Sequence, residues 1–353
     1  MTQIHDFSKP KESTKQSFVS GLELINMQID SVPMLFDDLL PQVGVCALVG
    51  ASDTCKSMLL RQLAMCNVAG SPFLGKCSNA IYKRSIVVCS EDDEFAISYL
   101  LRRQNKSIGL TDEQASRLTF LFDTENFIDK LIQEIETNPA DLIVIDAFGD
   151  LFDGRDLNQN NQVRSFLNKF STIANKYKCC VVFLHHTGKR TEEQAPSKNN
   201  AIGSQGFEAK MRLVIELRLD ASDDTLRHFC VVKGNYLPQS EKQSSHVIKI
   251  DENLTFTSTG TRVPFDELVS NKTSNGTNKK VVPENITEDT HTMFIESVFK
   301  NKKQFTKTDL TEKCSHFFMC SEKPARRFIS YYEENGFIKN VSKNRFSAYE
   351  LNN

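Results

Sequence analysis

The sequence lacks long hydrophobic runs and an excess of charge of one sign. Its longest apolar runs, residues 43–51 and 179–184, have the length of a strand and fall short of the roughly 18 residues that a membrane-spanning helix needs. The polar N-terminal residues contain no apolar region typical of a signal peptide. The formal net charge is −2, which excludes a uniformly basic nucleic-acid binder but allows a local basic patch.

The sequence also has no Cys-x-x-Cys pair, although it contains ten cysteines. Scattered cysteines without an export signal are typical of reduced thiols, so we expect a cytoplasmic protein with no membrane contact. Hydrophobic residues make up 39% of the 353 residues, which is enough to fill a core and excludes global disorder. A chain of this length forms one large or two modest domains.

Short apolar runs alternate with longer helical patterns over most of the chain. Apolar strands that are separated by helices indicate an α/β fold with a mostly parallel sheet covered on both faces. The last strands, near residues 246–250 and 254–258, have no helix between them and predict an antiparallel extension. A stretch rich in Asn, Thr and Lys predicts a linker. The expected tail, core domain, linker and second domain are residues 1–18, 19–265, 266–286 and 287–353.

A phosphate-binding loop is the strongest local pattern. The segment GASDTCKS (50–57) follows an apolar strand and precedes a helical pattern, which is the context that a P-loop requires. Backbone N–H groups at a helix N-terminus bind phosphate, with Lys56 reaching the β- and γ-phosphates of ATP and Ser57 holding Mg²⁺. The expected nucleotide-binding residues of this loop are Gly50, Ser52, Asp53, Thr54, Cys55, Lys56, Ser57 and Met58.

The loop departs from the usual pattern at one position. Cys55 precedes the lysine where glycine is usual, and glycine lets the backbone approach a phosphate with no Cβ in the way. Asp53 adds a negative charge near the phosphates. Cys55 therefore puts ATP turnover in question, and a strand–turn–helix that binds no nucleotide is the alternative interpretation.

Three further apolar strands end in polar side chains. Asp146 ends the strand LIVID and predicts a Mg²⁺ ligand, direct or through water. Glu91 follows another strand and could polarise a water against the γ-phosphate, although the acids at 92 and 93 alternatively cap the next helix. His185 and His186 end a third strand, where a histidine could sense the γ-phosphate. A zinc site is disfavoured because no cysteine or carboxylate has ligand spacing.

These segments, taken in order, resemble a known family. GASDTCKSM, SEDD, LIVIDAFGDLF, VVFLHHTGK, GSQGFEAKMRLVIELR and VVKGNYLP are similar to the RecA-fold ATPases of the RepA-type hexameric plasmid replication helicases, and to AAA-type ATPases of bacterial mobile elements. The resemblance covers residues 27–250. It implies a RecA-like P-loop NTPase core that forms a homo-oligomeric ring, usually a hexamer, with ATP and Mg²⁺ between subunits.

The resemblance also implies roles for individual residues. Arg212 lies where an arginine from the neighbouring subunit is expected to stabilise charge on the transferred phosphoryl group, and Lys233 is a second candidate in trans. A solvated surface charge is the alternative for both. The matching positions within one subunit are Lys56 and Ser57 (P-loop), Asp146 (Mg²⁺), Glu91 (catalytic glutamate) and His186, or His185 (γ-phosphate sensor).

Basic residues in two regions predict DNA contact. Lys189 and Arg190 lie in the long loop 188–206, which together with loop 149–161 would face the channel of a ring. A plain surface loop is the alternative. Residues 287–353 have the pattern of three helices and a hairpin, which resembles a winged helix, and winged helices bind either DNA or proteins. The expected DNA contacts of its third helix and wing are Lys323, Arg326, Arg327, Lys343 and Arg345.

The combined interpretation is an ATP-dependent, DNA-acting ring ATPase of a bacterial mobile element, of the replicative helicase or loader type. A second interpretation is a nucleotide-gated regulatory or partner-recruiting protein with weak or no hydrolysis. Cys55 and the lack of a recognisable primase domain favour this second one. A non-enzymatic scaffold is the third. The expected partners are a second copy of the chain, DNA, and a primase, relaxase or transposase.

Overall fold

The chain divides into two compact units, Met1–Ser270 and Asn271–Asn353, with the division inside the predicted linker. In the part of the chain described here, no helix is long and apolar enough to cross a membrane. The computed structural model describes residues 18–152, 156–157, 159–188, 191–201, 205–269, 283, 286–300, 302–318, 322–341 and 348–352, without the side chains of residues 192, 205, 289 and 322–324.

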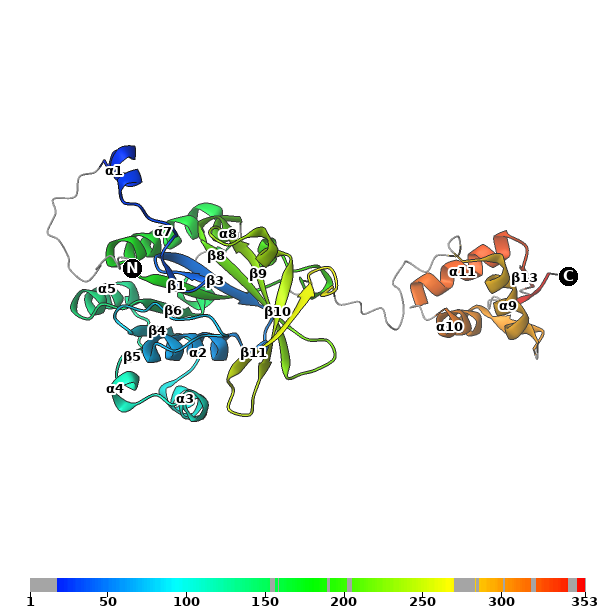
Figure 1. Cartoon of the computed structure of the whole chain (residues 1–353). Helices are drawn as coiled ribbons and strands as arrows, with labels where there is room; N and C mark the ends of the chain where they lie inside the picture. The colour runs from blue at the N-terminus through cyan, green and yellow to red at the C-terminus, as the bar shows by residue number, and fades with distance from the viewer. Residues whose placement is uncertain are drawn as a thin grey trace. The chain divides into compact units, whose positions relative to one another are not determined.

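A mixed sheet forms the centre of the first unit and has nine strands among the described residues (Figure 1). Six neighbouring strands are parallel, and three antiparallel strands extend the sheet on one side. The predicted α/β class with a mostly parallel sheet is confirmed. The strand order is β11 (Phe256–Pro264), β10 (Ser244–Ile250), β9 (Leu226–Gly234), β8 (Leu213–Leu219), β3 (Gly44–Gly50), β7 (Cys180–His186), β6 (Leu142–Asp146), β4 (Ser85–Cys89) and β5 (Leu118–Leu121).

Helices cover both faces of the sheet because its parallel strands are apolar on both sides. Successive side chains of a strand point to opposite faces, so Leu48 of β3 packs in one buried cluster and Ala47 in the other. Figure 1 shows the two helical layers. The helices are α2 (Lys56–Ala69) and α3 (Glu94–Ile108) on one face, and α5 (Phe127–Thr137), α7 (Asn160–Tyr177) and α8 (Gln205–Lys210) on the other.

Two elements differ from the prediction. The expected channel loop 149–161 is wrong at both ends, since it begins inside α6 (Phe148–Leu151) and ends inside α7. The ring of Phe148 packs 5.5 Å from that of Phe183, which anchors the chain directly after β6 and favours a helical turn there. β5 has no predicted counterpart because its four side chains are all only half-buried, so LTFL lacks the pattern of a core strand.

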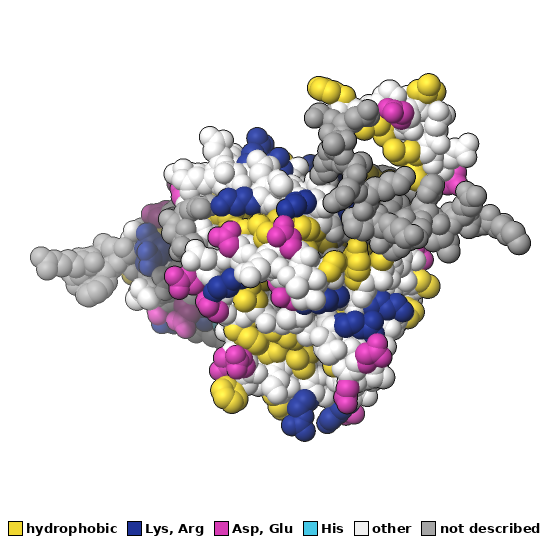
Figure 2. Space-filling view, turned by 90° about the vertical axis from the view of Figure 1, so that its left-hand side faces the viewer, with side chains coloured by type: hydrophobic (Ala, Val, Ile, Leu, Met, Phe, Trp, Pro, Cys, Tyr) yellow, Lys and Arg dark blue, Asp and Glu magenta, His cyan; other side chains and the backbone are white. Residues whose placement is uncertain are grey.

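Short elements complete the first unit. The helix α1 (Gly21–Asn26) begins with a capping box in which Ser20 and Glu23 satisfy each other's backbone N–H groups. Its apolar side chains are exposed, with Leu22 at 68% and Ile25 at 76%. On the face drawn in Figure 2, acidic and basic side chains interleave with hydrophobic ones. The remaining short elements are β1 (Met34–Phe36), β2 (Leu40–Pro41) and α4 (Asp112–Ala115).

The second unit contains three helices and a small antiparallel sheet in its described residues. Aromatic rings fill its core, where Phe294 stacks 5.7 Å from Tyr332 and Phe318 stacks 4.2 Å from Phe328. The sheet has the order β12-β14-β13. The elements are α9 (Glu288–Phe299), β12 (Gln304–Thr306), α10 (Lys307–Phe317), α11 (Glu322–Glu334), β13 (Ile338–Asn340) and β14 (Ala348–Leu351).

Candidate nucleotide site

Four parallel strands, β3, β4, β6 and β7, end at one edge of the sheet. Gly50 at the end of β3 lies opposite His186 of β7, and Cys89 at the end of β4 lies opposite Asp146 of β6. The segments that follow these strands therefore meet in one place, where α/β sheets bind ligands. We name this side of the sheet the carboxyl edge, and the side where the parallel strands begin the amino edge.

The loop after β3 closes tightly over the end of its strand. A Cβ on Gly50 would lie 2.5 Å from the carbonyl oxygen of Leu217, so only glycine fits at this position. The Ala51 carbonyl accepts hydrogen bonds from the Thr54 hydroxyl at 3.0 Å and from the Lys56 ammonium at 2.6 Å. Thr54 and Lys56 are both buried. The loop therefore has a defined shape, with the lysine folded against it.

Cys55 has the conformation that explains why glycine is usual at its position. Its φ is +69° and its ψ is 31°, in the left-handed region, and it stands directly before α2. This conformation costs a residue with a Cβ about 1–2 kcal/mol. Asp53 also has a positive φ, 62°, and with Ser52 it forms the exposed tip of the loop. The cysteine thus keeps the backbone path of a P-loop at an energetic cost.

Asp146 and Ser57 have the donor set of a magnesium site. The Ser57 side chain is hydrogen-bonded to Asp146, and the buried Oδ1 of Asp146 has no hydrogen-bond partner among the described residues. A buried carboxylate oxygen without a partner, beside a hydroxyl, suits a hard cation. Burial raises the pKa of Asp146 to about 6, and the charge of Glu91 adds to this effect. A cation at Oδ1 would offset both causes, so these residues fit Mg²⁺.

Lys56 lies among the carboxylates of this edge. Burial lowers the pKa of its ammonium, whereas the charges of Asp146, Glu91 and Asp53 oppose that change. The ammonium is desolvated, so its attraction to a phosphate is stronger than it would be in water. Met58, the last residue predicted in this loop, is half-buried against the core and its carbonyl accepts a hydrogen bond from Gln104.

Glu91 and His186 approach each other from neighbouring strand ends. The Oε1 of Glu91 lies 3.8 Å from the Nε2 of His186, and both side chains are more than a third exposed. His185 instead points into the core, where its ring packs 4.9 Å from Phe148 and 4.8 Å from Phe207. Of the two histidines, His186 is therefore the one at the carboxyl edge.

The ends of β4 and β6 are tied together by hydrogen bonds. Ser90 donates its N–H to the Asp146 carbonyl at 2.8 Å, and the Ser90 Oγ accepts the N–H of Ala147 at 2.9 Å. Asp93 caps α3, with its Oδ1 accepting the N–H of Ala96 at 2.8 Å. These contacts hold Glu91 between two fixed backbone points.

Two arginines at the carboxyl edge were not predicted from the sequence. Arg61 of α2 is 4% exposed and lies 3.7 Å from a carboxylate oxygen of Asp92. Its place in the apolar run SMLLRQLAM was a usable signal, because an arginine there must be buried. Arg227 of β9 is 6% exposed and contacts the P-loop, and no sequence pattern indicates this, because an antiparallel strand far along the chain brings it there.

The two residues expected to act in trans lie away from the P-loop of their own chain. The Arg212 N–H donates to the Val45 carbonyl at 2.7 Å, directly before β8, which runs parallel to β3. Arg212 is therefore at the amino edge. Lys233 lies opposite Val214 near the start of β8, and its ammonium is 2.9 Å from a carboxylate oxygen of Glu208. Neither side chain can reach a phosphate in its own subunit.

The segment after β7 is held at the carboxyl edge by a buried ion pair. The carboxylate of Glu216 lies 2.6 Å from the guanidinium of Arg218, and both are nearly inaccessible. Glu216 also accepts the Ser197 N–H and the Asn200 amide, while Arg218 donates to the Gln194 carbonyl. The predicted DNA contacts Lys189 and Arg190 lie outside the described residues.

The predicted DNA contacts of the second unit are described in part. Arg326 and Arg327 are exposed on α11, whose other face carries the buried Phe328 and Tyr332. The backbone of Lys323 lies in α11. The side chain of Lys323 and the wing residues Lys343 and Arg345 lie outside what the structure describes.

The fold and this site together define a P-loop nucleotide-binding domain. A family model described as an AAA domain matches residues 10–192, just over half of the chain. The chain therefore belongs to the AAA-domain family, and its nucleotide site is that of an AAA-type P-loop ATPase domain. No curated protein matches the chain.

Solved structures resemble the first unit in fold. The chain is similar to the solved ATPase domain of a helicase, with a TM-score of 0.51 and 11% identity over 67% of this chain and 95% of that one. It is also similar to a KaiC-like protein from the hyperthermophilic archaeon Pyrococcus horikoshii OT3, with a TM-score of 0.45 and 14% identity over 65% of this chain and 97% of that one. The first of these likenesses supports the predicted RecA-like core.

Proposed function

We propose that the protein hydrolyses ATP at the carboxyl edge of its sheet and acts on DNA. The observation that carries the proposal is the convergence of Lys56, Ser57, Asp146 and Glu91 from three segments of the chain onto one edge. A nucleotide-binding site needs the first three, and hydrolysis needs a base such as Glu91.

Each residue has a distinct task in this proposal. Lys56 releases the Ala51 carbonyl and pairs with the β- and γ-phosphates. Ser57 and Asp146 hold Mg²⁺, which would neutralise phosphate charge. Glu91 orients and deprotonates the attacking water, and His186, 3.8 Å away, responds to the γ-phosphate through Glu91.

Self-association supplies the remaining catalytic charges. Arg212 is exposed at the amino edge, on the opposite side of the sheet from the P-loop, so a head-to-tail contact between copies would bring it to a neighbour's ATP. Lys233 is a second candidate once its ion pair with Glu208 opens. The exposed apolar side chains of α1 also favour assembly. The arrangement that we propose is a ring, such as the hexamer that the resemblance implies.

The second unit supports the DNA-acting part of the proposal. Three helices followed by a small antiparallel sheet have the order of a winged helix, and α11 presents Arg326 and Arg327 to solvent. This is consistent with a replicative helicase or loader of a mobile element, with a primase, relaxase or transposase as partner.

The alternative is a nucleotide-gated regulatory protein with weak or no hydrolysis. The left-handed Cys55 favours it, because an added side chain beside the phosphates narrows the loop. Such a protein would bind ATP and change its assembly without turning it over.

ATP turnover with and without single-stranded DNA tests the proposal. We expect turnover that rises with DNA, is lost in Lys56→Ala and is retained in Lys176→Ala, a surface lysine that serves as the matched control. Nucleotide binding without turnover in the native chain, with turnover recovered in Cys55→Gly, would favour the regulatory alternative. No nucleotide binding would contradict both functions.

A further inference from the structure

Arg227 joins the antiparallel extension of the sheet to the back of the P-loop. Its Nε donates to the Thr54 carbonyl at 3.3 Å, and its Nη2 lies 3.6 Å from the Cys55 Sγ. Its Nη1 donates to the carbonyls of Asp224 and Leu226 at 2.6 and 2.7 Å. The guanidinium thus contacts both residues that precede Lys56 and is anchored at its other end to its own turn.

The partners of Arg227 are all uncharged. Among the ion pairs between described residues, none includes this guanidinium, although the side chain is only 6% exposed. A buried arginine without a carboxylate is costly unless its donors are satisfied or an anion lies near. Its position beneath the P-loop places its charge where the phosphates of a nucleotide would arrive.

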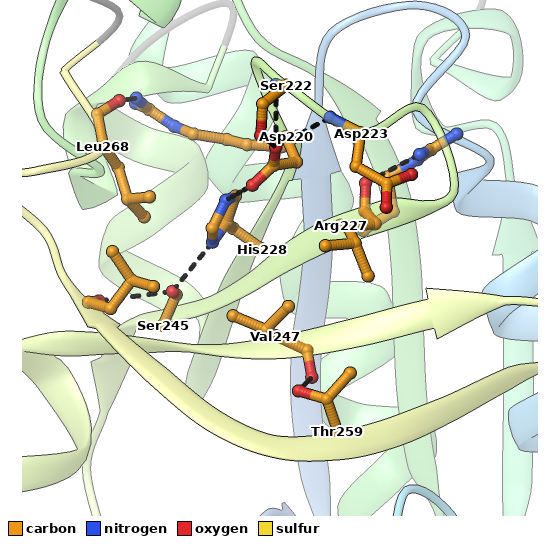
Figure 3. Close-up of polar contacts among 12 residues, drawn as sticks. Asp220, Ser222, Asp223, Arg227, His228, Ser245, Val247, Thr259 and Leu268 are labelled. Atoms are coloured by element: carbon orange, nitrogen blue, oxygen red, sulfur yellow. Dashed lines mark hydrogen bonds and ion pairs between the residues drawn. The ribbon is translucent and has the colours of Figure 1, made fainter.

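A network of hydrogen bonds fixes the turn that carries Arg227. Figure 3 shows His228 between Asp220 and Ser245, at 2.9 Å from the Asp220 Oδ2 and 3.0 Å from the Ser245 Oγ. The Oδ1 of Asp220 accepts N–H bonds from Ser222 and Asp223 at 2.8 and 3.0 Å. Because Arg227 and His228 are successive residues of β9, they point to opposite faces, so this network leaves Arg227 directed at the P-loop.

We propose that Arg227 is a positioning residue that holds Cys55 in the left-handed conformation which glycine would adopt unaided. By binding the Thr54 carbonyl and the Cys55 thiol, the guanidinium fixes the turn before Lys56 and sets the loop amides for phosphate. The inference rests on the proposed nucleotide function of this site.

The test is a double-mutant cycle on nucleotide affinity. Binding of a fluorescent ADP analogue with Mg²⁺ is measured for the full chain and for Arg227→Met, Cys55→Gly and the double variant. We expect Arg227→Met to raise the Kd at least about tenfold in the native chain and less than about threefold in Cys55→Gly. Arg262→Met, which removes an arginine bound to Glu241 and Ser244 on β11, is the matched control and should leave the Kd unchanged.

Two outcomes would overturn the inference while leaving the nucleotide site intact. One is an unchanged Kd in Arg227→Met, and the other is an equal loss in both backgrounds, which would show that Arg227 does not act through Cys55. Absence of binding in the native chain would instead contradict the proposed function.

A second variant keeps the inference testable if Arg227→Met does not fold. Cys55→Ala retains a Cβ in the left-handed turn but loses the contact between the thiol and the guanidinium. It should bind the nucleotide more weakly than the native chain, whereas Cys55→Gly should bind at least as well. Equal affinity of Cys55→Ala and the native chain would contradict a role for the thiol contact.

Discussion

The two edges of the central sheet carry their charged residues in different ways. At the carboxyl edge, Lys56 and Asp146 are held in place by neighbouring groups within one chain. At the amino edge, Arg212 is exposed and Lys233 is paired with Glu208, and neither reaches its own P-loop. The contrast indicates a site that is prebuilt for binding in each chain but incomplete for catalysis until a second copy contributes its amino edge.

The largest expected effect separates these two edges by turnover. Arg212→Ala should lower ATP turnover by about 10³-fold and leave the nucleotide Kd unchanged, because a finger in trans acts on the transition state and not on binding. Turnover and Kd measured side by side check this. A matched loss of affinity would place Arg212 in the binding site itself, and unchanged turnover would remove it from catalysis.

The second effect removes binding from the carboxyl edge. Lys56→Ala should weaken nucleotide affinity on the order of 100-fold, because a desolvated charge-assisted contact with phosphate is lost. Equilibrium binding by fluorescence measures it, with Lys176→Ala as the surface control. An unchanged affinity would mean that the loop after β3 does not hold the phosphates.

The third effect tests whether the carboxyl edge is rigid without a ligand. Burial by itself raises the pKa of Asp220, but its hydrogen bonds, above all those from Ser222, hold the pKa at about 2. A lowered pKa stabilises the fold above pH 4, and this contribution is lost as the pH falls towards 2. Asp220→Asn should therefore lower the free energy of unfolding by about 2 kcal/mol near pH 7. Denaturant unfolding measures it, and a loss that does not shrink at low pH would exclude the titration of Asp220 as its cause.

The sequence predicted the carboxyl edge better than the amino edge. Gly50, Asp146 and His186 end strands of one parallel sheet, and such ends meet whatever the details of packing. Arg227 belongs to the antiparallel extension, whose register follows from turns and bulges that no pattern in the sequence specifies. The resemblance suggested a role in trans for Arg212, but only the strand direction shows that it lies at the opposite edge.

The smallest expected effect is the pH dependence of magnesium binding. Burial raises the pKa of Asp146 to about 6, so its carboxylate is protonated below that pH. Mg²⁺-dependent nucleotide affinity should fall about tenfold per pH unit below 6, because the metal needs the ionised form. The sign is opposite for the unloaded protein, whose stability gains from this raised pKa as the pH falls from 6 towards 4. Asp146→Asn should abolish the Mg²⁺ dependence at every pH, and a native profile that is flat from pH 5 to 7 would contradict it.

Mixing two inactive variants tests the central claim most directly. Lys56→Ala and Arg212→Ala chains should each lack turnover, yet contacts between an intact P-loop and an intact amino edge form when the two are combined. Random head-to-tail assembly of equal amounts makes about a quarter of the sites intact, so the mixture should recover about a quarter of native turnover. A mixture as inactive as its components would contradict completion of the site by a second copy.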